Sequence, residues 1–415
     1  MIAKVSPFNS DISVVAPPSK SYAHRLMIAS ALGSGKTVIK NVGTSDDVSA
    51  TANCLSALGA KVEISSGNAE IVGIFGAEKT NSAVLNCGES GSTLRFLMPI
   101  TSALGVKAEF TGKGKLLSRP NEILFDLLKR HGVTSDGYKL EGKLTSGVFE
   151  VDASVSSQYI TGLLFALPLL DGDSEIILSG EVVSADYINI TFEVLKLSGI
   201  KYNLDGRKIT VYGNQKYTMP KEVVSEGDWS GASFLLSLGV ISGKAEVKGL
   251  NINSAQGDKK ILEIVKSAGG KVELGESVIT YKSDLKGFKV NLENCPDLAP
   301  ITCVLASYAK GISEISGLKR LKIKESDRLK AISDMLKEAK VKYTATDEKI
   351  IIYGTGEVFG GKFDGYKDHR IVMSATVLGS SAKGLSEVTD AESVAKSYPD
   401  FFEDINGGNN VVLER

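Results

Sequence analysis

The chain contains a repeat with a period of about 70 residues, which restricts its possible folds more than any other feature. Five segments share a helix-ending pattern: an apolar residue, four positions later a glycine or once a lysine, and then a β-rich run. These segments begin at Leu55, Leu128, Leu195, Val265 and Leu336, so the steps between them are 73, 67, 70 and 71 residues. Five matches at nearly constant spacing indicate duplicated supersecondary units.

Predicted helix starts keep the same spacing. They are loops of Ser, Asp and Gly, residue types that cap helices. They fall at Lys20, Ser90, Ser157, Asp228, Asp297 and Asp368. Alternating segments between them, such as Lys349 to Tyr353, predict strands. Because 415 residues are long for one core, the sequence predicts an α/β or α+β fold of two domains, with six copies of a β-and-helix unit, about three per domain.

Composition argues against several classes of protein. The 48 Lys and Arg residues balance 49 Asp and Glu residues, so a broad nucleic-acid-binding face is not expected. The longest apolar stretch, Tyr159 to Leu170, is too short to cross a bilayer. The first residues have no signal-peptide pattern, and the four cysteines form no C-x-x-C pair, so we expect a reduced cytoplasmic protein without membrane contact. Three scattered histidines show no zinc spacing.

The segment from Pro17 to Arg25 contains the first candidate anion site. The prolines end an extended segment, and Ser19 is placed to cap a helix. Lys20 then lies at the helix start, while Ser21 and Arg25 share a face at i, i+4. Unpaired N–H groups and the helix dipole favour negative charge there, so added cations and a hydroxyl predict anion binding. A capped surface helix with solvated charges is the alternative for this stretch alone.

Other loops of the first half have similar chemistry. The glycines of Gly88 to Arg95 allow backbone N–H groups to approach an anion closely, although a tight capped turn would look the same. Arg119 precedes a proline and is suited to bidentate contact with carboxylate or phosphate. A set of neutral donors comprises Ser156, Ser157, Gln158 and Ser184.

The second half adds carboxylates to the cations. Asp297 enters an apolar helix, where it can be a cap or a base beside a substrate hydroxyl. Lys324 and Arg328 are i, i+4 partners if that segment is helical, with Glu325 beside them. A salt-bridged surface helix is the alternative. The remaining candidates are His369, Arg370 and Lys396.

Together these stretches resemble the 5-enolpyruvylshikimate-3-phosphate synthases, a family of enolpyruvyl transferases, over nearly the whole chain. The Lys324 to Arg328 block and the order of the pieces are the specific part of the resemblance. The matching pieces are Pro18 to Ser21 with Arg25, Gly88 to Arg95, Arg119 and Pro120, Ser156 to Gln158, Glu226 to Asp228, Asp297, Lys324 to Arg328, Asp368 to Arg370, and Lys396.

The resemblance implies an inside-out α/β barrel fold, with two domains that each contain three copies of a βαβαββ unit. Their helix ends point at a cleft between the domains. The chain begins in one domain, crosses to the other and returns. We therefore expect one domain from residues 1–16 and 226–415 and another from 17–225. The crossovers near Pro17 and Glu226 then form a hinge, with Lys20 beside it.

The reaction implied by the resemblance joins shikimate 3-phosphate to phosphoenolpyruvate. The 5-hydroxyl attacks C2 of phosphoenolpyruvate while C3 gains a proton, and the tetrahedral intermediate then loses phosphate. Both substrates are polyanions, so the cleft needs fixed positive charge and hydrogen-bond donors. Binding should close the domains. We expect a monomer, with no metal or organic cofactor.

Site residues are carried over from the resemblance position by position. Shikimate 3-phosphate is assigned to Lys20, Ser21, Arg25, Ser156, Ser157, Gln158, Ser184, Asp297 and Lys324. Phosphoenolpyruvate is assigned to Lys20, Gly91, Arg119, Gln158, Arg328, Arg370 and Lys396. The catalytic set is Lys20, which touches both ligands, Asp297 as the base, Glu325 as the acid at C3, and His369 as support for that acid.

Three positions depart from the family pattern. Glu89 stands where many relatives have Asn, Phe96 where a Pro is common, and Arg320 where Asn is frequent. The reaction assigned by the resemblance does not depend on them, but substrate affinity and the response to the inhibitor glyphosate do.

Two other functions are alternatives to this one. The related transferase that acts on UDP-N-acetylglucosamine commonly has a Cys on the loop before the equivalent of Arg119. Residues Thr111 to Ser118 contain no Cys. They also lack the Asp that some relatives have at that position. A non-catalytic anion-binding module is the second alternative. Asp297 and Glu325 argue against it, because carboxylates do not help to bind polyanions.

Overall fold

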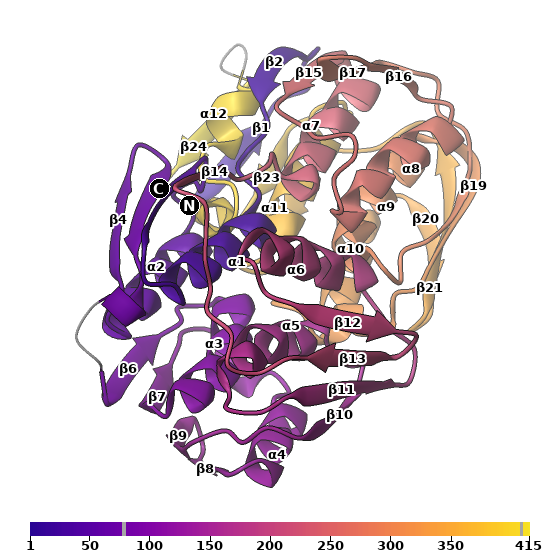
Figure 1. Ribbon diagram of the computed structural model, residues 1–415. Helices are drawn as coiled ribbons and strands as arrows, with labels where there is room; N and C mark the ends of the chain where they lie inside the picture. Colours follow the sequence, from indigo (N-terminus) through magenta and orange to yellow (C-terminus); the bar gives the residue numbers. More distant parts are fainter. Residues whose placement is uncertain (77–79, 407–409) are drawn as a thin grey trace. The chain divides into compact units, whose positions relative to one another are not determined.

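The computed structural model describes residues 1–76, 80–406 and 410–415. The chain divides into two compact units. Unit 1 comprises Met1–Pro17 and Glu226–Arg415, and unit 2 comprises Pro18–Ser225. Each unit is described by itself below, with the element labels of Figure 1. Among the described residues, no helix has the length and apolar character of a bilayer span.

Unit 2 contains three sheets of four strands in its described residues. In spatial order these are β14 (Glu222–Val224), β3 (Lys36–Lys40), β5 (Asn68–Val72) and β4 (Lys61–Ser65); β6 (Ser82–Asn86), β7 (Lys107–Thr111), β9 (Lys139–Gly142) and β8 (Val133–Asp136); and β10 (Val148–Asp152), β11 (Ser174–Ser179), β13 (Lys208–Val211) and β12 (Tyr202–Asp205). The helices are α1 (Lys20–Ala31), α2 (Asp46–Ala57), α3 (Gly91–Leu104), α4 (Glu122–Arg130), α5 (Ser157–Ala166) and α6 (Ala185–Leu197), with 3₁₀ turns η1 (Ile74–Gly76), η2 (Leu116–Ser118) and η3 (Leu167–Leu169).

Unit 1 is built in the same way. Its sheets are β16 (Lys271–Leu274), β17 (Ser277–Tyr281), β15 (Lys244–Lys248) and β2 (Asp11–Val15); β18 (Lys289–Asn291), β19 (Lys310–Ser316), β21 (Lys349–Thr355) and β20 (Lys342–Ala345); and β22 (Lys362–Phe363), β23 (Ser386–Val388), β1 (Ile2–Val5) and β24 (Val411–Glu414). The helices are α7 (Trp229–Ser242), α8 (Ile261–Ser267), α9 (Ala299–Tyr308), α10 (Arg328–Glu338), α11 (His369–Gly379) and α12 (Phe401–Ile405), with 3₁₀ turns η4 (Gly257–Lys260), η5 (Pro296–Leu298), η6 (Lys319–Ile323) and η7 (Ala391–Lys396).

All six of these sheets share one pairing pattern, with a single parallel pair at one edge and two antiparallel pairs. Two parallel pairs join strands far apart in the chain. Val38 of β3 pairs with Glu222 of β14, and Asp11 of β2 pairs with Lys244 of β15. The recurrence of one strand-pairing pattern in these six sheets confirms the predicted α/β fold of repeated units.

The interior of each unit contains buried helices, and the sheets lie around them with one face in water. Strands such as β10 alternate exposed and buried residues, as expected for a sheet with one face in water. In contrast, every residue of α7 is buried, including Trp229. A helix that is apolar on all sides must be surrounded by protein. In unit 1, α7, α9 and α11 pack on one another, and in unit 2, α3 packs on α5 (Figure 1).

The predicted helix ends are confirmed in their backbone geometry. Gly59, Gly132, Gly199 and Gly269 have φ of 100°, 90°, 76° and 83°, which is the left-handed region. Lys340, the one exception to glycine in the repeat, also adopts φ of 57°. A left-handed residue after the last turn satisfies carbonyls that the helix leaves unpaired.

The predicted helix caps are confirmed at four of the six starts. The side chains that accept a capping hydrogen bond are those of Ser90, Ser156, Asp228 and Asp368. Ser19 occupies the cap position of α1, but its side chain makes no capping hydrogen bond. Asp297 lies within η5, before α9, and does not cap that helix, because its carboxylate binds cations instead.

Three glycines at strand ends lie where a side chain would strike a helix terminus. They are Gly73 after β5, Gly213 after β13 and Gly354 in β21. A Cβ atom at these positions would lie 2.9, 2.7 and 2.6 Å from the carbonyl oxygens of Ser30, Leu170 and Ala306. These three repeats therefore need the glycine so that the sheet can approach the end of the neighbouring helix.

We expect Gly354→Ala to lower the free energy of unfolding by about 2 kcal/mol, because the added methyl group meets backbone that cannot move aside. Urea denaturation followed by circular dichroism measures the change. Gly275→Ala is the matched control, since a Cβ there has nothing within 4 Å. Equal midpoints for the two variants would contradict this explanation of Gly354.

Candidate active site

The guanidinium of Arg328 lies among three carboxylates in unit 1. Its Nε donates to Asp368 Oδ2 at 2.7 Å, its Nη1 donates to Asp297 Oδ1 at 2.8 Å, and its Nη2 donates to Glu325. Arg328 is only 1% exposed. Burial alone would lower its pKa, but Asp368, Glu325 and Asp297 together raise it. The group is therefore a permanent buried cation that holds the three acids in place.

The loop before α10 sets the positions of this cluster. Lys324 and Glu325 follow η6, and α10 begins only at Arg328, capped by Asp327 on the amide of Lys330. The segment from Lys324 to Arg328 is not helical, so the i, i+4 pairing that a helix would give these two residues does not form. The two cations instead meet at a shared carboxylate, because Lys324 Nζ lies 3.2 Å from Asp297 Oδ1.

Asp297 is bound by cations from three segments. Lys324 and Arg328 contact its Oδ1, and Arg370 Nη2 lies 3.0 Å from its Oδ2. Burial favours a raised pKa for Asp297, but Arg370, Lys324 and Arg328 outweigh it and hold the pKa well below its usual value. Asp297 is ionised at neutral pH, and its basicity depends on how closely these cations hold it.

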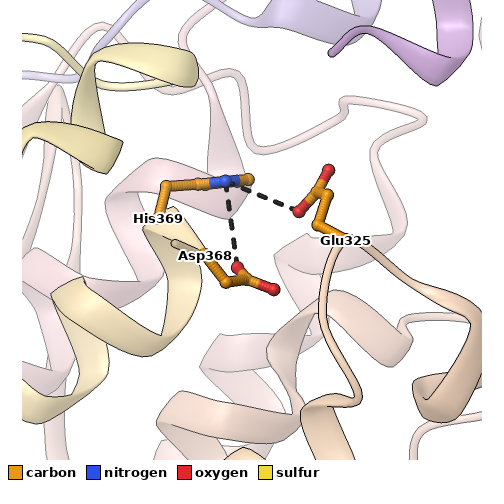
Figure 2. A group of neighbouring side chains, drawn as sticks. All are labelled: Glu325, Asp368 and His369. Atoms are coloured by element: carbon orange, nitrogen blue, oxygen red, sulfur yellow. Dashed lines mark ion pairs between the residues drawn. The ribbon is translucent and has the colours of Figure 1, made fainter. Parts of the chain in front are cut away.

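Glu325 also faces an imidazole and an ammonium group. His369 Nδ1 lies 3.6 Å from Glu325 Oε2 and 3.9 Å from Asp368 Oδ1, and Lys396 Nζ lies 3.5 Å from Glu325 Oε1. Figure 2 shows the His369 ring directed at both carboxylates. Glu325 is partly open to solvent, whereas His369 and Lys396 are buried. A carboxyl group with donors on two sides is suited to proton transfer.

The ligand atoms of Glu325, Asp368 and His369 all lie within 4.8 Å of one another, which is a spacing that a metal ion could use. The electrostatics do not fit a cation. Arg328 already donates to both carboxylates, and Lys396 lies against Glu325. A divalent ion would have to displace the guanidinium, so we do not propose a metal here.

Arg370 connects Asp297 to residues that the sequence did not single out. Its backbone amide donates to Asp368, which caps α11, and its Nη1 donates to Ser230 at the start of α7. Asp258 of η4 is fully buried nearby, and burial raises its pKa to about 6 against the opposing charge of Arg370. Asp258 had no sequence signal, because the contact arises from the packing of η4 on α7.

In unit 2, Gly91 lies against two of the predicted anion contacts. A Cβ atom at Gly91 would lie 3.1 Å from Arg119 Nη1, 3.7 Å from Gln158 Oε1 and 3.8 Å from Arg95 Nη1. Gln158 is held on both sides, since Oε1 accepts from Arg95 at 2.8 Å and Nε2 donates to Ser92 at 3.0 Å. The structure thus brings Gly91, Arg119 and Gln158 together. Arg95 is an additional residue of this group, and it lies in the Gly88 to Arg95 stretch.

Lys20 is the first residue of α1, and its Nζ lies 2.9 Å from Asp47 Oδ2 near the start of α2. Asp47 was also missed, although Ser45 at the start of α2 is a residue type common at helix starts and places Asp47 in the first turn. This ion pair holds the ammonium group at the start of α1.

Arg25 ties α1 to two other helices. Its guanidinium donates to Thr191 Oγ1 at 2.8 Å and to the carbonyls of Ser21 and Tyr187 at 2.8 and 2.9 Å, with a longer bond to Thr161. Burial lowers the pKa of Arg25 to about 10. The side chain therefore braces α1 against α5 and α6, in addition to any contact with a ligand.

The neutral donors lie at the starts of the helices that Arg25 contacts. Ser156 caps α5 through the amide of Gln158 at 3.3 Å, and Ser157 is the buried first residue of that helix. Ser184 is the buried cap residue of α6, with a left-handed φ of 55°. The predicted site residues thus fall into two sets, one at helix starts of unit 2 and one around Arg328 in unit 1.

Comparison with known proteins identifies relatives along the whole chain. The family model described as EPSP synthase (3-phosphoshikimate 1-carboxyvinyltransferase) matches residues 3–405. A 3-phosphoshikimate 1-carboxyvinyltransferase of Clostridium kluyveri is 39% identical over 414 residues, which covers 96% of this chain and 95% of the relative. One from Clostridium novyi is 35% identical over 425 residues, covering 99% and 97%.

Solved structures show the same fold. An EPSP synthase from Acinetobacter baumannii superposes with a TM-score of 0.83 at 24% identity, over 100% of both chains. The enolpyruvyl transferase NikO from Streptomyces tendae has a TM-score of 0.78 at 16% identity, over 97% of this chain and 96% of its own. Two differently named enolpyruvyl transferases thus share the fold, so the fold alone does not choose the acceptor.

We expect Arg328→Met to lower the free energy of unfolding by about 3–5 kcal/mol, because three buried carboxylates lose their common cation. Lys330→Met is the control on the same helix. Its ion pair with Asp334 is exposed and screened by solvent, so this substitution should change stability little. Urea denaturation measures both variants. Similar losses for the two would show that Arg328 does not hold the cluster together.

We expect stability to fall as the pH drops below about 4, the usual value for an aspartate. Cations hold the pKa values of Asp297 and Asp368 below that value, so this stabilisation is complete above the unfolded pKa and is lost as the pH falls through the folded one. Urea midpoints between pH 5 and pH 3 test this. The slope should be shallower for Asp297→Asn, and an unchanged slope would contradict the low pKa of Asp297.

Proposed function

The chain belongs to the EPSP synthase family, and on this premise we propose that it transfers the enolpyruvyl group of phosphoenolpyruvate to the 5-hydroxyl of shikimate 3-phosphate with release of phosphate. The family agrees with the resemblance found in the ordered motifs, and it disfavours both alternatives, the UDP-N-acetylglucosamine transferase and the non-catalytic module. The observation that carries the proposal is the pair of carboxylates, Asp297 and Glu325, inside one network of cations.

Addition to an enol ether needs one proton removed and another delivered. We assign removal of the hydroxyl proton to Asp297. Three cations lower its basicity in the ligand-free chain. Anionic substrate groups that attract Lys324 and Arg370 would loosen these cations from Asp297 and raise its pKa toward a useful value. The base is then activated by substrate binding itself.

We assign delivery of the proton to C3 to Glu325. Its carboxyl contacts Arg328, His369 and Lys396, and it is partly open to solvent, so it can exchange its proton. His369 holds the carboxyl in one orientation from its place at the start of α11. The phosphoenolpyruvate anion would be held by Arg328, Arg370 and Lys396, whose charges match its phosphate and carboxylate.

Unit 2 supplies the remaining anion contacts in this proposal. Lys20, Gly91, Arg119 and Gln158 are assigned to phosphoenolpyruvate, where the amides at the start of α3 add donors to the side chains. The residues assigned to shikimate 3-phosphate in this unit are Lys20, Ser21, Arg25, Ser156, Ser157, Gln158 and Ser184. Serine hydroxyls and a lysine suit a phosphate group beside a polyhydroxylated ring.

We also propose that the two units act as the two predicted domains. The boundaries between Pro17 and Pro18 and between Ser225 and Glu226 support crossovers at these points. Because one reaction would use residues of both units, substrates should draw the units together. The expected monomeric state, cytoplasmic location and independence from cofactors stay predictions.

We expect phosphate release from phosphoenolpyruvate when shikimate 3-phosphate is present, and none with UDP-N-acetylglucosamine. Asp297→Asn should keep substrate binding and lose about 10²–10⁴-fold in rate, the usual contribution of a general base. Asp334→Asn removes an exposed carboxylate and should leave the rate unchanged. A phosphate-release assay together with calorimetric titration of the substrates measures both effects.

Phosphate release with UDP-N-acetylglucosamine alone would overturn shikimate 3-phosphate as the acceptor. Phosphate release with neither acceptor would favour the non-catalytic anion-binding module. Full activity in Asp297→Asn would remove this residue as the base.

A further inference from the structure

A buried line of polar groups runs through three helices of unit 2. His24 Nδ1 lies 2.7 Å from Thr51 Oγ1, and Thr51 Oγ1 lies 2.7 Å from Thr93 Oγ1. Thr93 Oγ1 then donates to Ser90 Oγ at 2.8 Å. None of these four residues is more than 1% exposed. We name His24, Thr51, Thr93 and Ser90 the hydroxyl relay.

The relay has one consistent proton order. Thr93 uses its only hydroxyl proton on Ser90, so it must accept from Thr51. Thr51 must then accept from His24, which places the imidazole proton on Nδ1. His24 Nε2 is buried and has no hydrogen-bond partner among the described residues. Burial also lowers the pKa of His24 to about 3, so the ring stays neutral.

The relay runs parallel to an ion pair that belongs to the proposed site. Lys20 lies one turn before His24 on α1, and its partner Asp47 lies one turn before Thr51 on α2. The Lys20–Asp47 ion pair and the His24–Thr51 hydrogen bond therefore join α1 and α2 at two successive turns. The His24–Thr51 bond continues to α3 through Thr93.

The far end of the relay is the start of α3. Ser90 caps this helix by accepting from the amide of Thr93 at 3.2 Å, so its hydroxyl receives two bonds from one residue. The next residue, Gly91, lies against Arg119 and Gln158. A helix leaves its first amides without intrahelical acceptors, which makes this end a donor for anions. The hydroxyl relay therefore helps to fix the orientation of the start of α3.

An aromatic ring covers the relay. Phe96 lies one turn after Thr93 and meets the His24 ring edge to face, with centroids 6.5 Å apart. The guanidinium of Arg25 lies 5.0 Å from the centroid of the same Phe96 ring. The four residues are buried, so the hydroxyls depend on one another, on His24 and on the Thr93 amide for hydrogen bonds. A slide of one helix would leave a buried polar group unpaired, which is strongly unfavourable.

We propose that Thr51 and Thr93 are positioning residues, which fix the start of α3 with Gly91 relative to the start of α1 with Lys20. The proposal rests on the proposed function, in which both helix starts bind phosphoenolpyruvate. Neither threonine touches the substrate in this scheme. Both act through the helices they join, so their loss should weaken binding of phosphoenolpyruvate more than it slows the chemical step.

Thr51→Val removes the hydroxyl and keeps the shape, and Thr101→Val is the matched control. Thr101 is on α3 and fully buried, but its hydroxyl donates to Met98 of its own helix. We expect Thr51→Val to raise the KM for phosphoenolpyruvate about tenfold, the effect of one misplaced contact, with kcat within about threefold. Thr101→Val should change neither constant, and Thr51→Ser should restore the KM.

A second measurement does not depend on activity. The ¹⁵N spectrum of the imidazoles in the ligand-free protein should show His24 with its proton on Nδ1, and Thr51→Val should alter that signal while Thr101→Val does not. The chain has three histidines, so His24→Gln assigns the resonance. A wild-type proton on Nε2 would overturn the relay, even if Thr51→Val did not fold.

The outcomes separate the two proposals. Equal KM values for Thr51→Val and Thr101→Val would overturn the positioning role. A wild-type protein without transfer activity would overturn the proposed function, and an altered His24 signal in Thr51→Val would then still support the relay itself. An unchanged His24 signal in that variant would overturn the relay whatever the activity.

Discussion

A buried guanidinium shared by three carboxylates organises the chemistry of unit 1. Charges in a protein interior are very unfavourable unless they are paired and hydrogen-bonded, so Arg328 and its partners must keep their relative positions. Asp297, Glu325 and Asp368 come from three different segments of the chain. The proposed base and the proposed acid are therefore held at a fixed separation before any substrate binds, which is the arrangement that electrostatic catalysis requires.

Unit 2 combines a few ions with a network of neutral polar groups. Gln158 is clamped between Arg95 and Ser92, and the hydroxyl relay links the starts of α1, α2 and α3. Lys20 is paired with Asp47. Hydroxyls and amides can be buried at lower cost than charges when every hydrogen bond is satisfied. A rigid frame of this kind can present cations and helix starts to an anion without a competing cluster of carboxylates.

Some predictions failed where a local pattern had two explanations. Lys324 and Arg328 have helical spacing, but the segment between them is a loop, because Asp327 caps the next helix and Arg328 starts it. Asp297 has the sequence context of a cap, yet three cations bind its carboxylate. In both cases, charge pairing between distant segments outweighed the weak local preference that the sequence pattern reports.

The sequence by itself determined the repeat, the type of each element and the order of the functional motifs. These depend on near neighbours, such as the left-handed residue at Gly59 or the cap at Asp228, and local hydrogen bonds decide them. Only the tertiary structure decided which charges share a partner and which hydroxyls meet. The partners of Asp258, Asp47 and Thr51 could not be read from the local sequence, because these contacts arise only when helices pack on one another.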